Sequence, residues 1–349
     1  MSISRITDWL AVSRPIIQAP MAGVQGSELT LAVCAAGGLG SLPCAMLTPE
    51  QLQQALVQIR ESTTQPYNVN FFCHTQPAPD AATEARWQAR LQPYYQMLGL
   101  SQDRIVAGAG RRPFDAETLA LLDDFRPPVV SFHFGLPDES LLETLRSWGT
   151  KILSSATTLE EALWLQARGV DAVIAQGLEA GGHRGMFLTD DMTTQTGLFA
   201  LLPQLVDRLS VPVIAAGGIA SPAGVQAAFA LGASAVQVGT AYLLCPEAKT
   251  SALHRQALQS PEAVHTALTN LFSGRPARGI VNRVMRELGP ICVDAPAFPL
   301  ATAAIAPLRA EAEARGIADF SPLWAGQNTS GCQAIPAAEL TRWLMSATS

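Results

Sequence analysis

Short apolar segments recur along the first 240 residues of the chain, and amphipathic segments separate them. Eight of the apolar segments have the length and the β-forming residues of buried strands. They cover residues 14–20, 37–43, 67–72, 127–134, 150–156, 171–177, 211–218 and 233–240. Strands that are apolar on both faces and alternate with helices form parallel sheets covered by helices, so we expect an α/β protein.

The segments between these strands have the apolar spacing of helices. The clearest are residues 48–62, 138–149, 158–169 and 221–232, and two of them begin at a serine or threonine N-cap and end at a glycine. Eight strand–helix units predict a closed (β/α)8 barrel, the TIM barrel. An open doubly wound sheet is the alternative, and the count of eight favours the barrel.

Two long segments depart from this repeat. Residues 74–126 exceed a simple connection and contain a helical pattern, so we interpret them as a helical excursion between the third and fourth strands. Residues 246–320 have helical periodicity, proline breaks and no convincing strand, which predicts a small, mainly helical lid domain over the barrel mouth. Residues 336–347 predict a last helix that returns to the barrel. We therefore expect a barrel domain of residues 1–245, completed by residues 321–349.

Composition narrows the classes of function. The chain has 349 residues, of which 48% are hydrophobic and 15% charged, and its formal net charge is −6. It has no dense run of lysine or arginine, so neither nucleic acid nor an anionic membrane surface is an expected partner. The N-terminal residues contain no apolar core of signal-peptide length and no run of about 18 apolar residues follows, which predicts a cytoplasmic protein. Six cysteines without a C-x-x-C pair predict buried free thiols rather than disulfides or a metal site.

The glycines that end the last two strands indicate a phosphate site. The seventh strand ends in Gly217 and Gly218, and the eighth ends in Gln237, Val238, Gly239 and Thr240. These positions lie at the carboxyl ends of barrel strands, where such folds hold phosphate groups on backbone N–H groups. Glycines that only turn the chain into the next helix are the alternative. Neither a G-x-G-x-x-G nor a Walker motif occurs, so a phosphate-bearing cofactor in the barrel mouth fits better than a Rossmann or P-loop nucleotide site.

Flavin mononucleotide (FMN) is the cofactor that these features favour. Its ring presents mixed hydrogen-bond donors and acceptors, which amide side chains can meet. Asn70 and Gln176 lie at the ends of the third and sixth strands. Either amide can instead be a hydrogen-bonding residue of the core.

Two histidines are candidate catalytic residues. His183 lies in QGLEAGGHRG (176–185), a glycine-rich loop after the sixth strand, and His133 ends the fourth strand. A side chain that titrates near neutrality can bind an anion or take up a carbon proton. The alternatives are a loop histidine without a chemical role and a core histidine. In the same loop we expect Glu179 to cap a helix or to pair with Arg184.

Six ordered segments carry a resemblance to a known family. They are QAPMAG (18–23), NVNFF (68–72), EAGGHRG (179–185), PVIAAGGI (212–219), AVQVGTAYL (235–243) and SPLWAGQ (321–327). The set resembles the nitronate monooxygenases, formerly called 2-nitropropane dioxygenases, in their better-defined class I. The resemblance implies an FMN-containing barrel that oxidises alkyl nitronates, such as propionate 3-nitronate, with O2 to a carbonyl compound and nitrite.

The resemblance also implies the site residues. The family's flavin contacts fall on Asn70, Gln176, Gly181, Gly218, Gln237, Gly239 and Thr240, with Met21 and Ala22 near the ring, and Gly217 and Val238 complete the predicted set. The family's histidine is His183, which we expect to hold the nitro oxygens or to take a carbon proton. His133 is expected to assist it.

Two other functions stay open at this point. Barrels that reduce enoyl thioesters or quinones with NAD(P)H share the phosphate site, and such an enzyme would use the basic segment 275–283 for an anionic substrate. A flavin- or phosphate-binding regulator without catalysis is the third possibility. His183 and the segment 324–327 favour the nitronate enzymes. The sequence leaves open whether the chain is a monomer or a homodimer.

Overall fold

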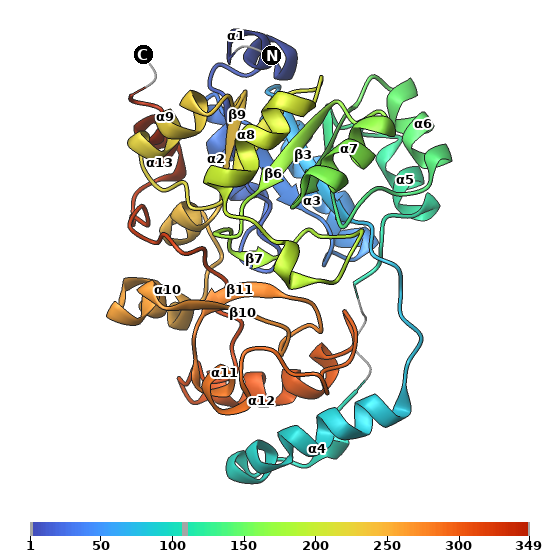
Figure 1. Cartoon of the computed structure of the whole chain (residues 1–349), viewed down its shortest axis with the longest axis vertical. Helices are drawn as coiled ribbons and strands as arrows, with labels where there is room; N and C mark the ends of the chain where they lie inside the picture. Colours follow the sequence, from blue (N-terminus) through green and yellow to red (C-terminus); the bar gives the residue numbers. More distant parts are fainter. Residues whose placement is uncertain (1–2, 107–110, 348–349) are drawn as a thin grey trace.

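Eight parallel strands form a closed barrel in the computed structural model, which describes residues 3–106 and 111–347 (Figure 1). They are β1 (Ile16–Gln18), β2 (Gly40–Pro43), β3 (Tyr67–Phe72), β4 (Val129–His133), β5 (Lys151–Ala156), β6 (Ala172–Gln176), β8 (Val213–Ala216) and β9 (Ala235–Val238). Their order is β1-β9-β8-β6-β5-β4-β3-β2, and a parallel bridge between Ile17 and Leu39 closes the ring. Each strand lies within one of the eight predicted segments, so the predicted (β/α)8 barrel is confirmed.

Helices cover the outside of the barrel, as the alternation of segments predicts. They are α2 (Ser27–Ala35), α3 (Pro49–Ser62), α5 (Ala116–Leu122), α6 (Glu139–Ser147), α7 (Leu159–Ala167), α8 (Leu198–Arg208), α9 (Pro222–Ala230) and α13 (Ala337–Leu344). Thr48 caps α3 in a capping box with Gln51, and Ser221 caps α9. The last helix, α13, packs against α2 and α9, so the chain does return to the barrel.

The two faces of each strand bury different layers. On β5, Ile152 packs in the cluster that joins the barrel to its surrounding helices, whereas Leu153 packs inside the barrel. Ile6 and Leu10 of α1 (Ile3–Leu10) belong to the inner cluster. Figure 1 shows α1 at one end of the barrel and a second, smaller layer at the other.

This second layer contains strands that the sequence pattern does not indicate. β10 (Thr266–Thr269) and β11 (Ala277–Ile280) pair antiparallel, and β7 (Gly182–His183), from the loop after β6, pairs with β11. The interpretation that residues 246–320 hold no strand is therefore wrong. Each strand is only four residues long or shorter, and one pairing joins segments distant in sequence, so local periodicity carries little signal.

Helices complete the second layer. They are α10 (Ala252–Gln259), α11 (Arg283–Leu288), α12 (Thr302–Ala314) and α4 (Ala81–Leu98), with the short 3-10 helices η1 (Gln102–Arg104) and η4 (Pro261–Val264) beside them. Two further 3-10 helices, η2 (Met192–Thr194) and η3 (Thr240–Leu244), lie in barrel loops. α4 is the predicted helical excursion, and it packs against α12, with Tyr95 Oη donating to the Ala304 carbonyl (2.6 Å; Figure 1). The second layer therefore contains not only the proposed lid of residues 246–320 but also α4, which comes from the part of the sequence assigned to the barrel domain. Residues 107–110 of the excursion, and residues 1–2 and 348–349 of the proposed barrel domain, lie outside the described chain.

The fold carries no sign of a membrane span or a metal centre over the residues described. None of the helices there is long and apolar enough to cross a membrane. The same residues contain no group of three or more His, Cys, Asp or Glu side chains suited to a metal ion. All six cysteines are free thiols; Cys34, Cys44, Cys245 and Cys292 are buried as predicted, whereas Cys73 and Cys332 are only partly buried.

Candidate functional site

A cavity of about 250 Å³ lies at the carboxyl ends of the barrel strands, next to the second layer. Both candidate catalytic histidines line it, and so do all the predicted cofactor residues except Val238. These are Met21, Ala22, Asn70, Gln176, Gly181, Gly217, Gly218, Gln237, Gly239 and Thr240. The Val238 side chain points outward, into the core between the barrel and its surrounding helices. Only its carbonyl, which accepts from the Ala19 N–H (2.8 Å), contacts the loop after β1.

Two buried glutamines shape the loop that carries Met21. Gln25 Oε1 accepts from the Met21 N–H (2.9 Å), and Gln25 Nε2 donates to the Ser41 carbonyl (2.6 Å). Gln18 Nε2 donates to Gln25 Oε1 (2.7 Å). Since buried amides are stable only when their groups are paired, this network fixes the QAPMAG backbone as one wall of the cavity. Gln25 was not predicted from the sequence, because one glutamine in a loop has no distinctive pattern.

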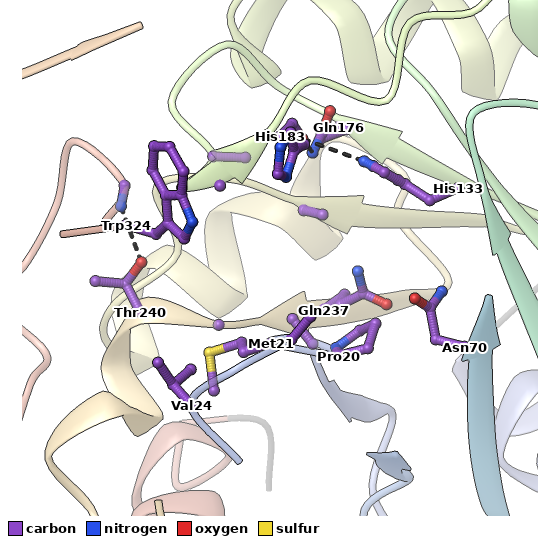
Figure 2. Close-up of a pocket in the computed structure, with 18 of the residues that line it drawn as sticks. Pro20, Met21, Val24, Asn70, His133, Gln176, His183, Gln237, Thr240 and Trp324 are labelled. Carbon is purple, nitrogen blue, oxygen red and sulfur yellow. Dashed lines mark hydrogen bonds between the residues drawn. The ribbon is translucent and has the colours of Figure 1, made fainter. Parts of the chain in front are cut away.

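The glycine pairs form a second wall. Gly217 and Gly218 have φ angles of +120° and +69°, which L side chains rarely adopt. A Cβ on Gly181 would lie 2.6 Å from the backbone of Ala325 and Gly326, so glycine is required there too. Thr240 Oγ1 accepts from the Gly326 N–H (2.9 Å; Figure 2). The segment after Trp324 therefore closes over the glycines.

The amide side chains of Gln176, Asn70 and Gln237 differ in how many of their hydrogen-bonding groups have protein partners among the described residues. Gln176 Nε2 donates to the His183 carbonyl (2.9 Å) and its Oε1 accepts from the Gly185 N–H (2.8 Å), so this amide is used to hold the loop. Asn70 Nδ2 donates to Ser131 Oγ (2.9 Å). Gln237 Oε1 is buried without a hydrogen-bond partner among the described residues. A buried acceptor without a partner is costly, so the Gln237 position fits a ligand that donates a hydrogen bond.

His183 and His133 lie on the side of the cavity opposite Met21, Asn70 and Gln237 (Figure 2). His133 Nε2 bonds the His183 carbonyl (3.2 Å) and must donate, because a carbonyl only accepts. His133 Nδ1 then accepts from Ser155 Oγ (2.6 Å). Both nitrogens of His133 are thus occupied, which argues against direct proton transfer by this residue. It holds the His183 backbone instead.

His183 lies among aromatic rings. Its ring centroid is 5.3 Å from that of Phe298 and 5.7 Å from that of Trp324. Burial, and then the positive charge of Arg111 nearby, hold the pKa of His183 well below its usual range. Burial also lowers the pKa of His133 to about 3. Both shifts run against the expectation that these side chains titrate near neutrality, and they favour the neutral form of each imidazole.

Two guanidinium groups near His183 were not predicted as site residues. Arg111 lines the cavity, and its Nη1 donates to Thr302 Oγ1 (3.4 Å). The Arg275 guanidinium lies 4.3 Å from the Phe134 ring centroid and donates to the Met186 carbonyl. Among the ion pairs within residues 3–106 and 111–347, none involves Arg111 or Arg275, although the charges of Asp190 and Glu161 act on Arg275 from a greater distance. Arg111 therefore presents a positive charge to the cavity, which suits an anionic ligand.

The other charged residues of the loop are structural. Arg184 is fully buried and donates to the carbonyls of Gly177 (2.7 Å) and Gln176 (2.8 Å). The Glu179 carboxylate accepts from the Leu198 N–H (2.8 Å), so it caps α8, one of its two predicted roles. In the basic segment 275–283, Arg278 Nε donates a hydrogen bond to the Leu178 carbonyl (3.0 Å).

Comparisons with known proteins show the family of the chain. The family model described as nitronate monooxygenase matches residues 3–346. The nitronate monooxygenase of Pseudomonas aeruginosa is 42% identical over 343 residues, which cover 98% of each chain. That of Paraburkholderia phytofirmans is 40% identical, over 96% of this chain and 92% of the relative. Among solved structures, nitroalkane oxidase from Streptomyces ansochromogenes has a TM-score of 0.88 and 39% identity over 98% and 97% of the two chains. FabK from Thermotoga maritima has a TM-score of 0.72 and 25% identity over 98% and 95%.

Proposed function

Because the chain belongs to the nitronate monooxygenase family and is therefore a flavin-dependent oxidoreductase, we propose that it binds FMN and oxidises alkyl nitronates, such as propionate 3-nitronate. The products are a carbonyl compound and nitrite, and O2 is the oxidant. One observation carries this proposal: His183, whose lowered pKa favours the neutral imidazole, lies across the cavity from Met21 and Gln237, and the nearby Arg111 guanidinium forms no ion pair within the described residues.

The residues of the cavity fit FMN. We expect the backbone of Gly217, Gly218, Gly239 and Thr240 to hold the phosphate, since the first N–H groups of η3 have no partner within that helix. The free acceptor of Gln237 and the amide of Asn70 are suited to the ring. When bound, FMN would supply the redox chemistry, which is to accept electrons from the nitronate and transfer them to O2.

The protein side chains bind and orient the substrate. A nitronate is already a stabilised carbanion equivalent, so its oxidation needs no strong base. We propose that Arg111 attracts the anion and that His183 contacts the nitro oxygens. With a neutral nitroalkane, the neutral imidazole of His183 is in the state that can accept the carbon proton. The aromatic rings around it exclude water from the reacting carbon.

Nitrite formation tests this function. Purified protein in air with propionate 3-nitronate is expected to release nitrite while it consumes O2. If protein that contains flavin released no nitrite in this assay, the proposed reaction would be excluded.

Charge at the cavity wall leads to a first prediction. Arg111→Gln is expected to raise the KM for a nitronate anion about tenfold, because it removes from a partly buried site a positive charge that has no ion-pair partner among the described residues. Steady-state kinetics with ethyl nitronate and with neutral nitroethane measure the effect, and the second KM should change less. Arg112→Gln is the matched control, since the neighbouring Arg112 is exposed and pairs with Asp115 and Glu117. Equal KM values for the wild type and Arg111→Gln would contradict the role of this charge.

The lowered pKa of His183 leads to a second prediction. The neutral, proton-accepting form is present above that pKa and is lost only as the pH falls through it. The kcat/KM for nitroethane should therefore stay flat between about pH 6 and 7.5, whereas a histidine with an ordinary pKa of about 6.5 would lose roughly three quarters of its neutral form at pH 6. A fall in kcat/KM with a midpoint near 6.5 would show that His183 titrates normally.

A further inference from the structure

Ser273 contacts one nitrogen of the candidate base. It lies in the turn between β10 and β11, is 1% exposed, and has its Oγ 2.9 Å from His183 Nε2. The two residues are 90 positions apart, and pairing of β7 with β11 brings them together. The β10–β11 turn thus supplies a polar contact to His183 among the aromatic rings that surround it.

The turn holds the Ser273 hydroxyl in a fixed place. The Asn270 side chain accepts from the Cys292 N–H (2.9 Å) and donates to the Cys292 carbonyl (2.9 Å). Gly274 has a φ of +89°, and a Cβ there would lie 2.1 Å from the Pro296 carbonyl oxygen. A turn packed this closely cannot easily move its serine away from His183.

The hydrogen-bond donors and acceptors around Ser273 distinguish the two neutral tautomers of His183. Ser273 has one proton, and its Oγ also lies 3.4 Å from the Arg275 carbonyl, which is an obligate acceptor. If that proton goes to the carbonyl, Ser273 accepts from His183 Nε2–H and every group has a partner. If it goes to Nε2, the Arg275 carbonyl loses its hydrogen bond, and no other donor to it is found in the described chain.

We propose that Ser273 is a positioning residue that keeps His183 in its Nε2–H tautomer and leaves Nδ1, the nitrogen that Ser273 does not contact, as the proton acceptor. This inference rests on the proposed function, in which His183 acts on the substrate. With a neutral nitroalkane, the C–H bond breaks, an Nδ1–H bond forms, and the electron pair stays on the resulting nitronate. The imidazolium that forms keeps its Nε2–H bonded to Ser273, which orients the ring as the third member of a catalytic triad orients its histidine.

The tautomer can be read directly by ¹⁵N NMR of the flavin-bound enzyme labelled at histidine, with His183→Asn used to assign the signals. At pH 7.5 we expect a pyrrole-like signal for His183 Nε2 and a pyridine-like signal for Nδ1. Ser273→Ala should give a mixture of both tautomers, and Ser273→Thr, which keeps the hydroxyl, should restore the wild-type pattern. A protonated Nδ1 in the wild type would overturn the proposal, and this reading needs no substitution of Ser273 that could disturb folding.

Kinetics give a second readout. Ser273→Ala is expected to lower kcat for nitroethane about tenfold to a hundredfold, but kcat for ethyl nitronate less than about twofold, because only the neutral substrate needs a base. Ser321→Ala is the control, since it removes another buried serine hydroxyl of the same layer, which bonds Glu313 (2.7 Å). Equal losses with both substrates, or no loss, would overturn the positioning role. Absence of nitrite from the wild type with ethyl nitronate would instead refute the proposed function, and the NMR reading would still decide the tautomer.

Discussion

Replacing His183 by asparagine is expected to lower kcat for a neutral nitroalkane by about 10²- to 10⁴-fold while FMN stays bound. The side chain lines the cavity between Phe298 and Trp324, and its neutral state is the one that accepts a proton. Asparagine keeps a hydrogen-bonding group but cannot take up the carbon proton. Single-turnover and steady-state kinetics with nitroethane measure the loss, and the flavin absorbance of the purified variant checks that the cofactor remains.

The matched control is His265→Asn, because His265 is exposed and does not line the cavity. It should behave as the wild type. With preformed ethyl nitronate, His183→Asn should lose less activity than with nitroethane, since no proton has to be removed. Full activity of His183→Asn with both substrates would exclude His183 from the reaction.

Replacing Gly218 by valine is expected to abolish FMN binding, and with it all oxidase activity. Gly218 has a φ of +69°, which a β-branched residue tolerates poorly, and its Cβ would lie 3.3 Å from Glu179 Cβ. The backbone would have to shift just where we expect it to hold the phosphate. The measurement is the flavin content after purification, followed by titration with added FMN, for which we expect the Kd to rise by more than about 100-fold.

Gly149→Val is the control for backbone strain. Gly149 has a similar φ of +77°, no atom lies within 4 Å of its added Cβ, and it follows α6, away from the cavity. Both variants should lose some thermal stability, but only Gly218→Val should lose flavin. Equal flavin content in the two variants would place the phosphate elsewhere.

The barrel could be predicted from local pattern because each of its strands is buried on both faces and flanked by helices. The polar residues predicted at the strand ends line one cavity because parallel strands bring their carboxyl ends to one face. The exception is Val238. Alternation along β9 turns Gln237 toward the cavity and Val238 into the outer core, so the period of two could have separated them.

The rest of the site depends on contacts between distant segments, which one sequence does not reveal. Ser273 meets His183 only because β7 pairs with β11. Arg111 reaches the cavity from the excursion after β3, and its charge points to an anionic ligand only because no carboxylate pairs with it in the part of the chain that the structure describes. The pKa of His183 follows from desolvation inside the fold, so an exposed loop histidine and a partly buried base look alike in sequence.

The most direct test of flavin-dependent nitronate oxidation is the flavin absorbance of the purified protein under anaerobic conditions. Propionate 3-nitronate and NADH are added to separate samples, and O2 is then readmitted. We predict that the nitronate bleaches the flavin rapidly, that NADH does not, and that O2 restores the absorbance with release of nitrite. Rapid bleaching by NADH together with no response to the nitronate would contradict the proposal and identify an NAD(P)H-dependent reductase on the same barrel.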